Sequence, residues 1–222
     1  MMKKNSIKDS LWYKLLRASF GLVGYTVGLY LTIKANIGVA PWDVFALGLG
    51  DKLSITLGQA TIFISIVVVI ADILLGERIG WGTVLDAIIV GSVLDFLEIL
   101  IPIPEFDNII VSIVMIIVGL FIMAFFQFFY MSAALSCGPR DTFLVGIGRL
   151  LPKIPIGGIL VGIEAIVLII GCLLGGQVGI GTIICVVCTG GIMQIVFNLI
   201  KFEPREVIHQ GLHIRRRVEA ED

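Results

Sequence analysis

Six long apolar segments limit what this chain can fold into more than any other feature of its sequence. The hydrocarbon core of a bilayer is about 30 Å thick, so a helix needs about 20 mostly apolar residues to cross it. Short polar breaks separate the segments, which are 12–33, 59–76, 82–101, 109–133, 157–175 and 181–200. In all, 58% of the residues are hydrophobic, compared with roughly 45–50% in soluble domains. The sequence therefore predicts an all-α integral membrane protein with about six transmembrane helices.

The distribution of Lys and Arg predicts how these helices are oriented, because both residues favour cytoplasmic loops. If the N-terminus is inside, fourteen of the 16 Lys and Arg residues lie on the inner side, and only Lys34 and Lys52 lie on the outer side. We therefore expect both termini to be cytoplasmic. Residues 1–11 would be a cytoplasmic N-terminus leading into a retained first helix, and residues 201–222 a basic cytoplasmic tail.

The chain also contains an internal repeat. Residues 41–50, PWDVFALGLG, recur as residues 139–148, PRDTFLVGIG, with Pro, Asp, Phe and two Gly in register. This divides the membrane region into a first repeat over 12–101 and a second over 109–200. Each repeat holds three predicted crossings, an odd number, so the second should enter the membrane in the opposite orientation. Inverted-topology repeats are typical of secondary transporters, although they also occur in channels or serve structure alone.

Each repeat is expected to contain a short helix that does not span the membrane. Proline is favoured at the first helical position, and an Asp two residues later complements the positive end of the helix. The glycines that follow predict a length of about two turns, which suits a re-entrant or interfacial half-helix. Non-helical backbone is tolerated at membrane depth only when it is buried in protein or lines a cavity. The residues expected to break or closely pack these helices are Gly38, Pro41, Gly48, Gly138, Pro139 and Gly146.

Four residues of the half-helices are candidates for binding a substrate or an ion. Asp43 and Asp141 either contact a ligand or only cap their helices. Arg140 either holds a carboxylate or phosphate in two-pronged fashion or pairs with Asp141. Trp42, its counterpart in the first repeat, either stacks on a ligand or anchors the chain at the lipid headgroups.

The fifth candidate is Asp95, because an ionisable group inside a span is costly and functional by default. Gly91 lies one turn before it and would let another helix approach the carboxylate, and its counterpart in the second repeat is Gln194. Asp95 is either a proton- or cation-coupling carboxylate or the acceptor of a hydrogen bond between helices. Asp86 lies half a turn out of phase with it. Glu164 is expected to form an ion pair with Arg140 or Arg149.

Three motifs resemble those of the YczE/YyaS/YitT group of bacterial multi-pass membrane proteins. They are GVAPWD at residues 38–43, GWGT at residues 80–83 and GPRD at residues 138–141. The resemblance covers roughly residues 12–200. It implies a multi-pass protein of the bacterial cytoplasmic membrane and supplies no substrate.

These observations favour a small-solute permease or secondary transporter of unknown substrate. Its expected partners are the lipid bilayer and a small molecule or ion, bound by Trp42, Asp43, Asp95, Arg140 and Asp141. Two alternatives stay open: a substrate-binding membrane subunit of a larger transporter, and a non-transporting scaffold or accessory protein. Whether the chain forms an oligomer or joins a partner subunit is also open.

Other functions lack their usual residues. The sequence has no HExxH motif, nucleophile elbow or Walker loop, and no His within an apolar segment, so we expect no enzyme activity. The CxxC of Cys185 and Cys188 lies in an apolar segment without a second Cys pair. We therefore interpret it as packing and expect no metal or cofactor. The net charge of −1 and the scattered basic residues give no support for binding nucleic acid.

Overall fold

A computed structural model describes residues 10–77, 79–104, 108–136, 138–154 and 156–202. Within these ranges the chain forms eight α-helices and no strand. The six predicted segments coincide with the six longer helices, and the two expected half-helices are α2 and α6. The helices are α1 (Leu11–Lys34), α2 (Pro41–Leu53), α3 (Leu57–Leu74), α4 (Trp81–Leu100), α5 (Ile109–Ser132), α6 (Pro139–Leu150), α7 (Ile156–Leu173) and α8 (Ile180–Leu199).

Four of these helices, α1, α3, α5 and α8, are long and apolar enough to cross a membrane. Helix α7 is apolar as well but slightly shorter over its described residues. Helix α4 has 20 residues, but three of them are the carboxylates Asp86, Asp95 and Glu98. Large apolar side chains such as Ile99 and Val187 are exposed on the outer surface at 83% and 71%. This all-helical architecture is that of a membrane protein, while the number of six spans stays a prediction.

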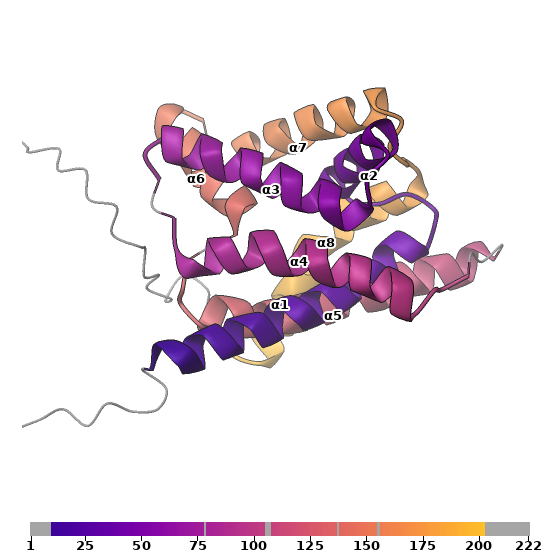
Figure 1. Cartoon of the computed structure of the whole chain (residues 1–222), viewed down its shortest axis with the longest axis horizontal. Helices are drawn as coiled ribbons and strands as arrows, with labels where there is room; N and C mark the ends of the chain where they lie inside the picture. Colours follow the sequence, from indigo (N-terminus) through magenta and orange to yellow (C-terminus); the bar gives the residue numbers. More distant parts are fainter. Residues whose placement is uncertain (1–9, 78, 105–107, 137, 155, 203–222) are drawn as a thin grey trace, which may run out of the picture.

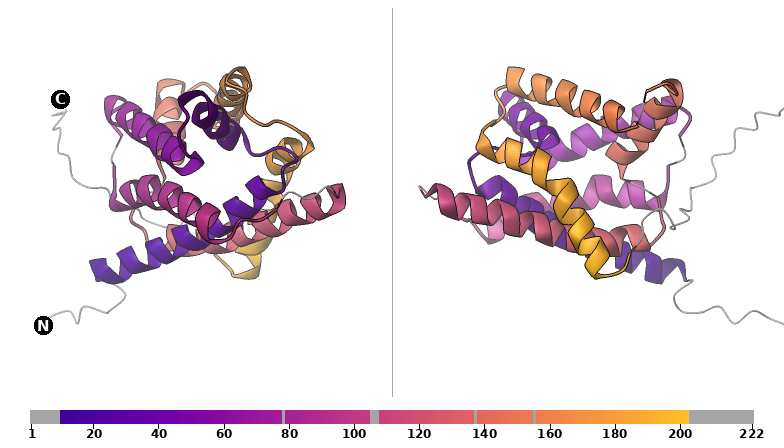
Figure 2. Two further views of the ribbon diagram at one scale, coloured as in Figure 1. Left: turned by 45° about the vertical axis from the view of Figure 1, so that its right-hand side comes forward. Right: turned by 180° about the vertical axis from the view of Figure 1, so that it is seen from behind.

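The helices form three layers (Figures 1 and 2). Helices α1 and α5 pack along one another on one side, and α2, α3, α6 and α7 lie on the other. Helix α4 lies between these layers against α1, whereas α8 starts between them, crosses α5 and ends beyond it (Figure 2). The two short helices lie toward opposite ends of the long axis of the molecule, α2 on the right and α6 on the left of Figure 1.

Glycines allow α1 and α5 to touch through their backbones. A Cβ atom added at Gly28 would lie 2.6 Å from the carbonyl oxygen of Gly119, and one added at Gly119 would lie 2.7 Å from that of Gly28. In a bilayer the lipid tails are as apolar as the side chains, so helices associate through close van der Waals packing rather than through the hydrophobic effect. Small residues at this crossing therefore join the two halves of the chain.

The chain enters each half-helix through a loop of the same backbone shape. Asn36 and Ala134 have φ angles of 55° and 58°, and Gly38 and Ser136 have φ angles of 105° and 118°. These residues are equivalent in the sequence repeat, at an offset of 98 positions. Gly38 is thus a break in the helical path, as predicted. Its counterpart is Ser136 rather than Gly138, which has an ordinary φ angle of −61°.

Each of these loops is held by a helix of the other half. The N–H of Gly181, at the start of α8, donates to the carbonyl of Ile37 at 2.7 Å. The N–H of Gly82, at the start of α4, donates to the carbonyl of Leu135 at 3.1 Å. A Cβ atom at either glycine would come closer than 3.0 Å to the backbone of the loop. The Gly-x-Gly motif therefore provides the close approach that satisfies these carbonyls.

The half-helices are longer than predicted. Helix α2 has 13 residues and α6 has 12, whereas the glycines predicted about two turns. Gly48 and Gly146 do not end the helices, because neighbouring segments pack closely on both. A Cβ atom at Gly48 would lie 2.8 Å from Leu174, and one at Gly146 would lie 2.9 Å from Leu75. These two glycines thus serve close packing, the other role proposed for them.

Gly28→Leu should lower the free energy of unfolding by about 1–3 kcal/mol or more, because overpacking forces backbones apart. Chemical denaturation in detergent would measure the change. The matched control is Gly162→Leu, since an added Cβ atom at Gly162 on α7 meets nothing within 4 Å. Equal stability of both variants and the parent would contradict the proposed role of the α1–α5 crossing.

Candidate functional site

The N-terminal turns of α2 and α6 meet inside the molecule. Nη2 of Arg140 on α6 lies 3.9 Å from Oδ1 of Asp43 on α2. The Arg140 guanidinium also lies over the ring of Trp42, with Cζ 5.0 Å from the ring centroid. The Asp43 side chain is 6% exposed and that of Arg140 33%. Three of the five predicted site residues therefore form one cluster, in which a charge of one half-helix pairs with a charge of the other.

Two cavities adjoin this cluster. The smaller has a volume of about 130 Å³ and lies between α1, α3, α4, α5 and α6. The larger has a volume of about 480 Å³ and lies between α1, α2, α5, α6, α7 and α8. Asp141, the fourth predicted site residue, lines both. The residues common to the two linings are Tyr25, Leu29, Gln127, Arg140 and Asp141.

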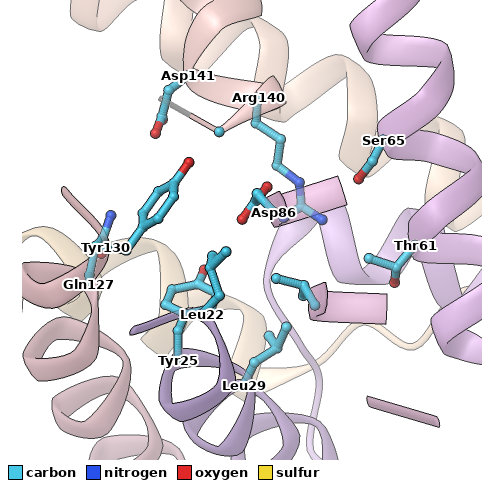
Figure 3. A pocket seen from close by; sticks show the side chains of 12 residues that line it. Leu22, Tyr25, Leu29, Thr61, Ser65, Asp86, Gln127, Tyr130, Arg140 and Asp141 are labelled. Carbon is cyan, nitrogen blue, oxygen red and sulfur yellow. The ribbon is translucent and has the colours of Figure 1, made fainter. Parts of the chain in front are cut away.

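Figure 3 shows the smaller cavity from close by. Arg140 and Asp86 point into it from α6 and α4, and Tyr25 and Leu29 approach from α1. Thr61 lies on the α3 side of the same space. The Arg140 guanidinium, which pairs with Asp43, thus also lines the smaller cavity.

The two cavities are built from equivalent positions of the sequence repeat. Adding 99 to Thr61 and Asp86 of the smaller cavity gives Leu160 and Cys185, which line the larger one. Subtracting 98 from Arg140 gives Trp42, which also lines the larger cavity. The two cavities therefore occupy corresponding places in the two halves, and they differ in volume.

The smaller cavity is flanked by α3 and α4, which pack closely against one another. A Cβ atom at Gly91 on α4 would come closer than 3.0 Å to the carbonyl oxygen of Gly58 on α3, and the reverse also holds. Asp95 secures this contact by accepting hydrogen bonds from the N–H of Gly58 at 2.9 Å and from Oγ1 of Thr56 at 2.5 Å. Helices α3 and α4 are thereby held together.

The corresponding helices of the second half, α7 and α8, lack this close packing. Added Cβ atoms at Gly157 on α7 and Gly190 on α8 would meet nothing within 4 Å. Gln194, the counterpart of Asp95, donates to Asn198 of its own helix at 2.9 Å. Among the described residues, α7 and α8 do not pack along one another as α3 and α4 do. In the rear view of Figure 2, α8 slants away from α7 toward α5.

Asp95 is the predicted site residue that lies apart from the others. It lines neither cavity and serves as the acceptor of the inter-helix hydrogen bonds, the second of the two roles considered for it. Glu164 does line the larger cavity together with Arg140. Within the described part of the chain it forms no ion pair, since Arg140 pairs with Asp43 and Arg149 pairs with Glu77 at 3.0 Å. The expected ion pair of Glu164 was therefore wrong for the described residues.

Sequence reasoning missed several polar residues of the cavities. Gln127 and Tyr130 are separated by about one helical turn and stand out in the apolar helix α5, which could have marked its inward face. The half-turn phase difference along α4 is a second signal, because it separates Asp86 in the cavity from Asp95 at the α3 contact. Tyr25 in α1 carries no such signal.

A double-mutant cycle over Arg140→Gln and Asp43→Asn tests the pair. Removing Arg140 leaves a carboxylate almost fully buried without its cation, so this single variant should lower the free energy of unfolding. The double variant should be less destabilised than the sum of the single ones, by about 0.5–3 kcal/mol. Chemical denaturation of the four proteins in detergent gives the coupling, and strict additivity would show that the pair contributes nothing.

Comparison with known proteins gives relatives along most of the chain. A protein of Haemophilus influenzae is 28% identical over 195 residues, which are 86% of this chain and 88% of that protein. The Bacillus subtilis membrane protein YczE is 28% identical over 178 residues, covering 78% and 80%. YyaS of the same organism is 27% identical over 187 residues, covering 83% and 92%. No solved structure matches the chain.

These relatives confirm the resemblance predicted from the sequence motifs. The word membrane in the name of YczE, together with the apolar helices described above, supports a membrane location for this chain. The match to the family extends over residues 12–198, from the second residue of α1 to the penultimate residue of α8. The chain therefore belongs to the family of unknown function DUF6198.

Proposed function

We propose that this protein is a small-solute permease or secondary transporter that works by alternating access. It would cross the bacterial cell membrane six times, through two inverted-topology repeats of three helices each, and would act without catalysing a reaction on its solute. The central site would be the cluster of Trp42, Asp43, Arg140 and Asp141 where the half-helices meet. Discontinuous helices that meet near the bilayer midplane are where such carriers bind their substrates.

One observation carries the proposal: equivalent segments of the two halves form a contracted and an expanded cavity that share two charged residues. The volumes are about 130 and 480 Å³, and Arg140 and Asp141 line both. Because the two halves are alike in sequence but pack differently, each half would be able to adopt the packing of the other. Exchanging them would contract the larger cavity and expand the smaller one.

The glycine pairs give this exchange a specific path. In the alternative state, Gly157 and Gly190 would meet as Gly58 and Gly91 do here, and α3 would separate from α4. Both contacts use residues without side chains, so either can close without displacing bulky groups. Arg140 and Asp141 would stay in place while access to them shifts from one half to the other.

The uneven distribution of basic residues between the two ends of the helices supports the proposed orientation. Lys34 pairs with Glu98 at 2.6 Å near the end of α1 and α4. Arg149 pairs with Glu77 near the end of α6 and α3. Because Lys and Arg favour the cytoplasmic side, the end that holds Arg149, Lys153 and Lys201 would face the cytoplasm, together with both termini.

Spin labels on equivalent lipid-facing positions would test the exchange. One labelled pair is Ile66 on α3 with Ile88 on α4, and its counterpart is Ala165 on α7 with Val187 on α8; all four side chains are exposed. In a cysteine-free chain in nanodiscs, pulsed electron resonance should give two distances for each pair. The short distance of one pair should accompany the long distance of the other.

Two substitutions should shift these populations in a defined direction. Gly190→Leu fills the space that α7 and α8 need in order to close, so it should remove the short Ala165–Val187 distance. Asp95→Ala deletes the hydrogen bonds that hold α3 to α4, so it should increase the fraction of molecules that show the long Ile66–Ile88 distance. Gly162→Leu is the control and should change neither. A single distance for each pair, unmoved by both substitutions, would contradict alternating access.

A further inference from the structure

The larger cavity has both charged residues and apolar walls. The charged residues of its lining are Asp43, Arg140 and Asp141 of the half-helices and Glu164 of α7. The rest of the lining is mainly aliphatic or thioether side chains, which make no specific contact with water or ions. They include Leu120, Met123, Leu144, Leu160, Val161 and Met193. Such a division of the surface matches a ligand that is itself divided into a charged and an apolar part.

The charged residues of the lining favour a cation. Three of them are carboxylates and one is a guanidinium. The N-termini of α2 and α6, which meet at Asp43 and Arg140, add about half a positive charge each. Acidic groups still outnumber basic ones next to apolar walls, where a carboxylate without a counter-charge is costly. A positively charged ligand would supply a counter-charge.

Trp42 and Asp43 already receive a cation in this structure. The Arg140 guanidinium lies 5.0 Å from the Trp42 ring centroid, within the range of cation–π attraction. Its nitrogen lies 3.9 Å from the Asp43 carboxylate, which is too far for a hydrogen bond. The Asp43 side chain is 94% buried, and its ion pair within the described residues is this one with Arg140. An aromatic face and a carboxylate thus stand together with capacity for a second cation.

The apolar walls extend to the outer surface between α7 and α8. Val161 and Val186 line the cavity and are also 65% and 52% exposed. Both lie well inside their helices, away from the helix ends. In a membrane, that level of the surface faces lipid tails rather than water. The apolar part of a ligand would therefore have favourable surroundings along its whole length.

We propose that the larger cavity binds an amphipathic organic monocation, with its charged group beside Trp42 and Asp43 and its apolar body between α7 and α8. This proposal rests on the carrier function and names the substrate class of the same site. Cation–π and electrostatic attraction would hold the charged group, and burial of apolar surface would hold the body.

Four matched compounds would separate these contributions. Benzyltrimethylammonium has both parts, neopentylbenzene is its neutral isostere, tetramethylammonium has the charge without the ring, and benzenesulfonate reverses the charge. Binding to the chain in nanodiscs would be measured by equilibrium dialysis of the radiolabelled first compound, with empty nanodiscs subtracted and the other three as competitors. The first compound should bind at least 10-fold more tightly than any of the others.

Variants locate the binding within the cavity. Asp43→Asn should weaken benzyltrimethylammonium binding at least 10-fold, and Glu164→Gln should weaken it by a smaller factor. Glu164 is only half-buried, so this second variant remains informative if the first does not fold. Asp51→Asn is the control, because Asp51 lies on the same α2 helix but is exposed at its far end.

Each outcome bears on a different part of the inference. Equal binding of neopentylbenzene would overturn the charge requirement, and equal binding of tetramethylammonium would overturn the apolar one. Tighter binding of benzenesulfonate, or parent-like affinity in both carboxylate variants, would also overturn the proposal. If no compound binds while the spin-label distances still exchange, the substrate class is wrong and the carrier stands. Selective binding without exchange would leave a binding site and remove the carrier.

Discussion

The hydrogen bonds from Gly181 to Ile37 and from Gly82 to Leu135 are the constraint on which the rest of the structure depends. A chain that leaves the helical path at membrane depth exposes carbonyl groups that lipid cannot satisfy. Here the start of a helix from the opposite half supplies the donor for each of these two carbonyls. Because glycine brings the two backbones together, the breaks before α2 and α6 become possible, and each half needs the other to complete it.

This mutual support explains where the charged cluster lies. Each loop is tied to the opposite half, so the first turns of α2 and α6 are directed toward the same region, where Asp43 and Arg140 pair at 3.9 Å. The glycine crossing of α1 with α5 then provides a common support on one side. The helices beyond it, α3 with α4 and α7 with α8, are not equally constrained, and they are the ones whose packing differs. The tied loops before α2 and α6, together with the differently packed helices around them, define the two cavities.

Much of this architecture could be predicted from the sequence, because apolar length and proline position act locally. The six apolar segments and the starts at Pro41 and Pro139 follow from such local rules. Gly48 was misjudged as a helix end because the effect of a glycine depends on what packs against it, here Leu174 from the other half. The separation of Asp95 from the cavity could not be foreseen for a similar reason. Whether such a carboxylate meets a ligand or a neighbouring helix depends on how the helices cross, and this packing cannot be read from a single sequence.

The hydrogen bonds of Asp95 also affect the free-energy difference between the two packings. Its two hydrogen bonds, to Thr56 and Gly58, have no equivalent at Gln194, which bonds within its own helix. Two identical halves would give two packings of equal free energy, populated equally. A net stabilisation of about 1 kcal/mol for each bond would instead favour the packing seen here by one order of magnitude or more. In a carrier built on this plan, a single unmatched carboxylate sets the resting orientation, and whatever binds must supply that difference before the molecule can turn over.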